Sequence, residues 1–158
     1  RCSAIVQYLA MIMISGQNYT GGFAGETIGA VMTGCSVNGT ESVNGTDYSG
    51  GFIGRASNAV VAGALDHLGI QIADFPVNTV MLGCSINGSA NVSATGSSGK
   101  ESGYAGGFIG EMRNSYAVDC SISSLGTVSG KDYTGGFAGL ATLVLLHLLM
   151  KIKVFLIL

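Results

Sequence analysis

The chain has no tryptophan, a single proline and few charged residues, and each shortage excludes a class of protein. Charged residues make up 10% of the 158 residues and apolar residues 47%, which is the opposite of the balance that keeps a chain disordered. The net charge of −2 offers no basic surface to nucleic acid, so we predict no nucleic-acid partner. The 26 glycines follow no three-residue period, and this excludes a collagen triple helix.

What the sequence does contain is one phrase written four times. "NYTGGFAG" begins at Asn18, "DYSGGFIG" at Asp47, "GYAGGFIG" at Gly103 and "DYTGGFAG" at Asp132. The Gly-Gly-Phe triplets begin at positions 21, 50, 106 and 135, so their spacings are 29, 56 and 29 residues. A catalytic motif is needed once, whereas a phrase at a fixed period is typical of repeat architectures.

The cysteines follow the same period. Cys35 and Cys120 each lie 14 residues after the start of a triplet and 15 before the next, and Cys84 holds the corresponding place in the long unit. The stretch "CSAIV" near the start of the chain reads as the end of an earlier unit, so we expect the chain to be a fragment of a longer protein. The long unit carries two excursions, one within 55–80 and a shorter one within 89–103.

These repeats predict an all-β fold, a parallel β-solenoid (β-helix) whose coils hold about 29 residues each. Each unit carries three strand-like runs separated by turn residues. We interpret "YTGGFAG" as one strand with Tyr19 and Phe23 on the same face, and expect its paired glycines to adopt backbone angles closed to other residues. An antiparallel β-sandwich or propeller-like sheet is the alternative.

Stacked coils would align equivalent residues in ladders roughly 4.8 Å apart. We expect Ile28 to share the interior with Val37, Ile86 and Ile122. The structural ladder is formed by the repeated aromatic and cysteine residues, namely Tyr19, Phe23, Cys35, Tyr48, Phe52, Cys84, Tyr104, Phe108, Cys120, Tyr133 and Phe137.

The sequence Tyr-x-Gly-Gly-Phe-x-Gly, followed by Cys-Ser-Ile/Val and then Val-x-Gly, resembles the GLUG repeat. "GGFAG" at 21–25, "GCSVNG" at 34–39 and "SVNG" at 42–45 match that pattern, with Phe in place of the usual Leu. The match covers roughly residues 14–139 apart from the insertion. GLUG repeats form long arrays in bacterial cell-surface and secreted proteins and carry no assigned catalytic residue. The resemblance therefore implies a surface or secreted protein that is not an enzyme.

The cysteine and aspartate positions do not suggest a metal site. Zinc sites need close Cys or His pairs, which the cysteine spacing lacks, so we expect small buried apolar residues, with a disulfide between neighbouring coils as the alternative. Asn18, Asp47 and Asp132 precede repeat tyrosines. Calcium requires six to eight oxygen ligands, so we interpret these three as turn residues. We predict no metal and no cofactor.

One acidic pair shares a repeat position. Glu26 and Glu111 correspond to each other, and Arg55 holds the same place in the unit between them. Glycoside hydrolysis needs two carboxyl groups facing each other across the bond, so we expect a solvated edge of alternating charge and no catalytic residue. His67 and His147 belong to no recognisable triad. A β-helix enzyme acting on polysaccharide is the alternative function.

We predict one solenoid domain over residues 1–139, interrupted by the insertion at 55–80. Within the insertion, Ser57 is expected to cap a short helix that includes Val60 and Val61 and ends at Gly69. This helical insertion would either shield the flank of the solenoid or contact a partner.

The last 19 residues, 140–158, break the pattern, with no glycine and 15 apolar residues. As a helix they would span roughly 28 Å, close to the thickness of a bilayer core, yet Lys151 and Lys153 fall inside the segment. A hydrophobic cap on the last coil, a membrane anchor and a non-native tail are the three interpretations, and membrane contact is expected only for the anchor.

The sequence as a whole predicts a non-catalytic structural or adhesive repeat segment with an extracellular or cell-surface location. The partners expected for such a segment are a host or cell-surface glycan or protein. The open strand edges at the ends of an array also predict end-to-end self-association.

Overall fold

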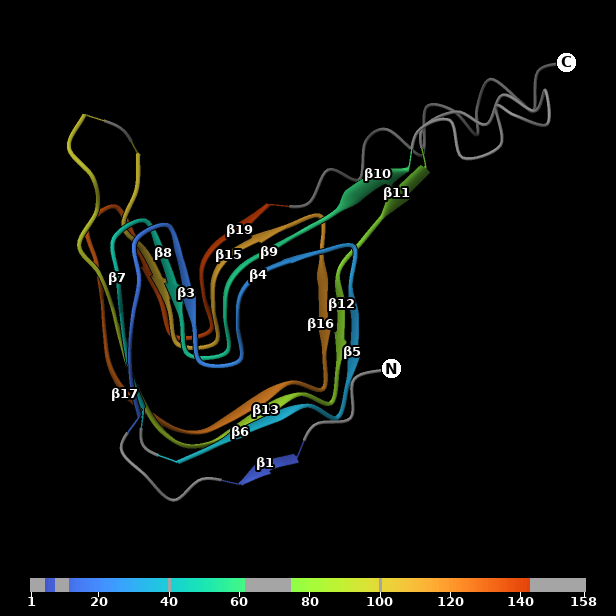
Figure 1. Cartoon of the computed structure of the whole chain (residues 1–158), viewed down its shortest axis with the longest axis horizontal. Helices are drawn as coiled ribbons and strands as arrows, with labels where there is room; N and C mark the ends of the chain where they lie inside the picture. The colour runs from blue at the N-terminus through green and yellow to red at the C-terminus, as the bar shows by residue number, and fades with distance from the viewer. Residues whose placement is uncertain (1–4, 8–11, 40, 62–74, 100, 143–158) are drawn as a thin grey trace, which may run out of the picture.

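The computed structural model describes residues 5–7, 12–39, 41–61, 75–99 and 101–142. Within these residues the chain is all β, and no helix is present. Figure 1 looks along the stack, where the strands of successive repeat units lie over one another. Because those strands pair in parallel, the arrangement is consistent with a β-helix and does not match the antiparallel alternative.

Three sheets hold one strand from each of several successive repeat units, four units in the first two sheets and three in the third. The first contains β3 (Tyr19–Gly21), β8 (Tyr48–Gly50), β14 (Tyr104–Gly106) and β18 (Tyr133–Gly135). The second contains β4 (Ala24–Ile28), β9 (Ile53–Ser57), β15 (Ile109–Arg113) and β19 (Ala138–Thr142). The third contains β5 (Val31–Thr33), β12 (Val80–Leu82) and β16 (Tyr116–Val118).

The fourth sheet forms the base of the stack in Figure 1, where β6 and β13 are labelled, and continues along its left side, where β7 is labelled. It contains both short and long strands. The long strand β13 pairs with β6 along its first half and with β7 along its second half, and both of these belong to the preceding unit. Its members are β1 (Ile5–Gln7), β2 (Ile12–Ser15), β6 (Ser36–Asn38), β7 (Glu41–Gly45), β13 (Ser85–Ala94) and β17 (Ser121–Gly130).

The repeated phrase is two strands joined by a tight turn, so the prediction of a single strand through "YTGGFAG" is wrong. Strand β3 ends at Gly21, the chain turns at Gly22 and Phe23, and β4 begins at Ala24. The tyrosine and phenylalanine of one phrase therefore belong to different segments, and they do not share a strand face.

The glycines of the phrase are required by close backbone approach. A Cβ on the first glycine of each pair would lie under 3.0 Å from the carbonyl oxygen of the residue after the phenylalanine, and Gly21 meets Ala24 in this way. A Cβ on Gly54 would lie 2.5 Å from the backbone nitrogen of Thr20. Neither the paired glycines nor Gly54 have a positive φ, so the expectation of unusual backbone angles is wrong for the paired glycines.

Positive φ angles occur instead at the corner that precedes each described cysteine. Gly34, Gly83 and Asp119 have φ angles of 61°, 60° and 53°. Glycine adopts this left-handed conformation without steric cost, and aspartate tolerates it better than most residues. The corner therefore turns the chain in the same way in three successive units.

The core lies between the Gly-Gly-Phe turns and the base sheet. Phe52, Phe108, Ile86 and Met81 are fully buried there. The expected alignment of Ile86 with Val37 and Ile122 is present in the strand register. Ile28 departs from the expectation, because its side chain is 55% exposed at the end of β4.

The insertion leaves the stack as an antiparallel pair of strands, β10 (Ala59–Val61) and β11 (Phe75–Val77). The predicted helix from Ser57 is wrong over the described part, because Ser57 ends β9 and Val60 and Val61 belong to β10. Val60 and Val61 are β-branched residues that favour a strand. Residues 62–74, with His67 and Gly69, lie outside the described residues.

Strand β19 pairs with β15 as far as Thr142, so the stacked sheets extend three residues past Gly139. Residues 143–158, which carry His147, Lys151 and Lys153, lie outside the described residues. No helix in the described part of the chain is long and apolar enough to cross a bilayer.

Candidate functional site

Glu26, Arg55 and Glu111 form a column of alternating charge along the second sheet. They are paired in strand register, and Leu140 continues the column beyond Glu111. Arg55 Nη1 lies 3.4 Å from Glu26 Oε1, and Arg55 Nε lies 3.2 Å from Glu111 Oε2. The sequence therefore anticipated the alternation of charge.

The burial of this column was not anticipated. The Glu111 side chain is fully buried, whereas the side chains of Arg55 and Glu26 are 23% and 29% exposed. Arg113 Nε donates a 2.6 Å hydrogen bond to Glu111 Oε1, and this bond raises the pKa of the Arg113 guanidinium. Each oxygen of the buried carboxylate thus faces a guanidinium group, so the column is in part an internal ion-pair network instead of a solvated edge.

The repeat tyrosines line the same region from the first sheet. Arg55 Nη1 donates a 2.8 Å hydrogen bond to Tyr19 Oη, and its guanidinium carbon lies 5.3 Å from the Tyr19 ring centroid. Burial raises the pKa of the Tyr48 phenol, and the Glu111 carboxylate adds to this effect. Burial also raises the pKa of Tyr104 to about 12. The arginine therefore connects the tyrosine and charge columns.

The predicted ladder residues lie in register from unit to unit. Tyr19, Tyr48, Tyr104 and Tyr133 pair along the first sheet, with ring centroids 4.8–5.3 Å apart. The phenylalanine rings stack in the core with centroid separations of 4.8–4.9 Å. Offset or edge-to-face aromatic pairs add roughly 0.5–1.5 kcal/mol each beyond the burial of area. The column of rings therefore contributes to holding successive units together, and its members are Phe23, Phe52, Phe108 and Phe137.

The three described cysteines lie in or beside the core. Cys35 and Cys84 are fully buried, and Cys120 is partly exposed. Each Sγ lies 3.5–3.8 Å from the carbonyl oxygen two residues earlier in the chain. Burial raises the pKa of the Cys84 thiol. No disulfide joins the described cysteines, so the alternative of a bridge between neighbouring units is not realised among them.

The residues before the repeat tyrosines lie at one corner of the stack but are used differently. Asp47 is buried and its Oδ1 accepts a 2.6 Å hydrogen bond from Ser97 Oγ, whereas Asp132 is exposed and its Oδ2 accepts a 2.7 Å bond from the Ser102 amide. Asn18 is exposed in the first unit. Among the described residues no group of three or more His, Cys, Asp or Glu side chains is placed to hold a metal ion.

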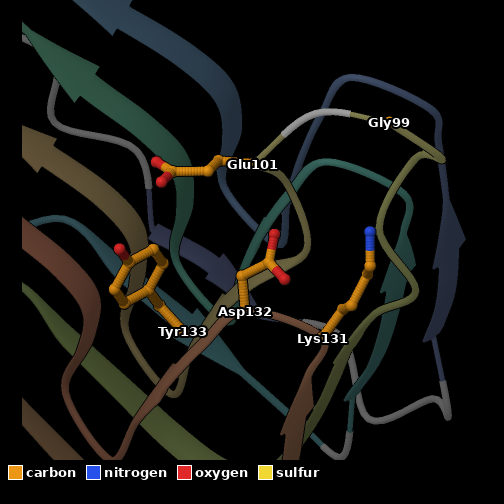
Figure 2. Close-up of a pocket in the computed structure, with 5 residues that line it drawn as sticks. All are labelled: Gly99, Glu101, Lys131, Asp132 and Tyr133. Atoms are coloured by element: carbon orange, nitrogen blue, oxygen red, sulfur yellow. The ribbon is translucent and has the colours of Figure 1, made fainter.

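A hollow of about 540 Å³ opens at this corner, lined by Gly99, Glu101, Lys131, Asp132 and Tyr133. Figure 2 shows the Asp132 carboxylate standing between the Tyr133 ring and the Lys131 side chain, with Glu101 above them. Gly99 and Glu101 come from the excursion within 89–103, and the other three lining residues come from the start of the next unit. The repeat spacing predicted the additional residues within 89–103, but it did not predict the hollow.

Comparison with protein-family models gives no match, and searches of curated proteins and of solved structures also return no match. The arrangement of the residues therefore carries the functional argument.

Proposed function

We propose that the chain is a segment of a parallel β-solenoid from a bacterial cell-surface or secreted protein with GLUG-type repeats, and that it is a non-catalytic structural and adhesive array. Its location would be extracellular or at the cell surface. Its partners would be a host or cell-surface glycan or protein, and its open edges would allow end-to-end association.

The observation that carries this proposal is that each conserved letter of the phrase has a packing role. Here the letters are those kept between the four copies in this chain. The tyrosine rings contact one another face to face or edge to face, the phenylalanine rings stack with Phe52 and Phe108 fully buried in the core, and the glycines allow two backbones to approach closely. When the repeated residues serve packing, each added unit stacks on the last in the same way. The array therefore extends one surface at a regular spacing between units. Many weak contacts on such a surface sum through effective concentration.

The charge column argues against the polysaccharide-cleaving alternative. A pair of catalytic carboxyl groups must face each other across a glycosidic bond, but Arg55 lies between Glu26 and Glu111 in the strand register. Glu111 is fully buried and faces two guanidinium groups. It therefore has no surface through which to reach a sugar.

The proposal is tested by coupling the chain to beads at graded density and measuring their retention on polysaccharide-coated surfaces and on intact bacterial cells. Retention should rise more steeply than the bead density, and it should occur without release of reducing sugar. Reducing sugar that appears with wild-type protein and disappears with Glu111→Gln would establish the enzyme alternative instead. Absence of retention on every surface would overturn the adhesive role.

A further inference from the structure

The described cysteines of successive units form a column at one corner of the stack, and its members are Cys35, Cys84 and Cys120. The serines that follow them directly, Ser36, Ser85 and Ser121, pair in strand register. Backbone hydrogen bonds join the same corners, because the Ser85 amide donates to Cys35 O and the Ser121 amide donates to Cys84 O. Each cysteine is therefore aligned with the cysteine of the next unit.

Cys84 and Cys120 are placed at the separation that a disulfide needs. Neighbouring strands lie about 4.8 Å apart, and the Cα atoms of bridged cysteines lie roughly 4.4–6.8 Å apart. Cys120 Sγ also lies 3.7 Å from Met81 O, and Met81 belongs to the unit that carries Cys84. The Cys120 side chain is thus directed toward the unit of Cys84.

The two cysteines differ in their access to solvent. Cys84 is fully buried, whereas Cys120 is partly exposed. Residues 121–158 contain no cysteine, so Cys120 is the last member of the column in this chain. Burial raises the pKa of the Cys84 thiol, and the neighbouring Cys120 adds to this effect. An oxidant that arrives from solution therefore meets Cys120 first, and Cys84 is the buried thiol beside it.

We propose that Cys120 and Cys84 form a site of reversible oxidation, in which hydrogen peroxide converts the two thiols into a disulfide between neighbouring units. The Cys120 thiolate first attacks one oxygen of the peroxide, the O–O bond breaks, and Cys120 sulfenic acid and one water molecule form. The Cys84 sulfur then attacks the Cys120 sulfur, an S–S bond replaces the S–O bond, and the hydroxyl group leaves as water with the Cys84 proton. In total, two thiols and one peroxide give one disulfide and two waters.

The disulfide joins two long strands at the ends where they begin. Strand β13 starts one residue after Cys84, and β17 starts one residue after Cys120. The two strands pair in parallel along most of their length. A cross-link between distant points of a chain removes conformational entropy mainly from the unfolded state, so the bridge stabilises the stack and keeps the strand register. Exchange with an external thiol reverses it.

The cysteine column supplies a matched control. Cys84→Ala and Cys120→Ser each remove one member of the pair, whereas Cys35→Ala removes a cysteine that is also aligned with Cys84 and is fully buried. Circular dichroism of the three variants checks that the fold is kept. Cys2 lies outside the described residues, and its peptide is followed together with the others.

The experiment treats the reduced whole chain with hydrogen peroxide, blocks the remaining thiols with N-ethylmaleimide and identifies the unreduced peptides by mass spectrometry. We expect a linked peptide that joins Cys84 to Cys120. This peptide should be retained in Cys35→Ala and lost in Cys84→Ala and Cys120→Ser. In Cys84→Ala, dimedone should trap sulfenic acid at Cys120, because the thiol that would condense with it is missing.

The wild-type protein alone decides whether the pair closes, so the test does not depend on the folding of a variant. Oxidation of Cys120 without a linked peptide, a bridge that contains Cys35 or Cys2 in place of this pair, or a bridge between two copies of the chain would overturn the proposal.

A second measurement follows the thermal midpoint. Oxidation should raise the midpoint of the wild type and of Cys35→Ala by roughly 5–10 °C, and dithiothreitol should reverse the rise. Cys84→Ala should show no such rise. A wild-type protein that forms the bridge with no gain in thermal midpoint would overturn the stabilising role of the site.

Discussion

Arg55 and Glu111 face each other across neighbouring strands, with the arginine Nε 3.2 Å from the glutamate Oε2, and only the glutamate is fully buried. A buried charge that loses a partner costs several kcal/mol, whereas replacing the whole pair with apolar residues is often neutral. This column itself contains an apolar member, because Leu140 follows Glu111 in the register.

The first prediction concerns this pair. Arg55→Met should lower the free energy of unfolding by about 3 kcal/mol, because Glu111 stays buried with one guanidinium partner fewer. Adding Glu111→Leu to that variant should restore most of the loss. Glu26→Gln, at the exposed end of the same column, should change stability by less than about 0.5 kcal/mol. Denaturant titration of the four proteins completes the comparison, and a double variant no more stable than Arg55→Met would contradict it.

A second prediction follows from the contact between backbones in the repeated phrase. A Cβ on Gly110 would lie 2.7 Å from the Ser49 backbone nitrogen, whereas the nearest atom to a Cβ on Gly136 is Leu125 Cδ2 at 3.5 Å. Gly110→Ala should therefore cost about 3 kcal/mol, the upper end for overpacking. Gly136→Ala should change stability by less than about 1 kcal/mol, in either direction. Equal thermal midpoints for the two variants would remove close approach as the reason for the glycines.

The third prediction is a stability change in alkali. The pKa of Tyr104 is raised by burial to about 12, above its ordinary value of about 10. The folded protein therefore holds this proton more tightly than the unfolded chain does. The corresponding stability is fully present below about pH 10 and is lost as the pH rises toward 12.

Absorbance of tyrosinate during an alkaline titration should show late-titrating groups, because the pKa values of both Tyr48 and Tyr104 are raised, and Tyr104→Phe should remove the Tyr104 contribution. The stability of the Phe variant should also fall less between pH 10 and 12, since it carries no ionisable group there. A wild-type protein in which every tyrosine titrates near its ordinary pKa would contradict this prediction.

The fourth prediction concerns the reactivity of the three described cysteines. Cys35 and Cys84 are fully buried, and burial raises the pKa of Cys84, whereas Cys120 is partly exposed. Since the thiolate is the reactive form and must be accessible, a neutral alkylating reagent should modify Cys120 first in the native protein. Peptide mass spectrometry at successive times gives the order, and denatured protein supplies the control in which all three react alike. Modification of Cys84 at the rate of Cys120 would show that the core opens more easily than its burial indicates.

The spacing of the repeats was enough to predict which residues align between units. The 29-residue interval between triplets places Tyr19 on Tyr48 and Phe23 on Phe52, and the parallel pairing of stacked strands is present as expected. A fixed period determines the register between units, because any slip would displace every equivalent residue at once.

The repeat spacing could not predict which residues within one unit form strands and which form turns. Two strands of three to five residues around a glycine turn have the same letters as one longer strand, and only their backbone contact distinguishes the two. The apolar run at Val60 and Val61 was likewise ambiguous between helix and strand, as short apolar runs are. The sequence did contain a sign that Glu111 has a second cationic partner. Arg113 follows two residues later, and residues two apart lie on the same face of a strand.

Thr79 closes the point at which the insertion leaves the stack. Its buried hydroxyl group donates a 2.7 Å hydrogen bond to Ser57 O and accepts one of 3.2 Å from the Ala30 amide. The chain that leaves the stack before β10 and the chain that returns to it after β11 are thus joined to each other. For protein engineering, this junction is a graft point, where foreign sequence of varied length can replace the excursion while the neighbouring units keep their alignment.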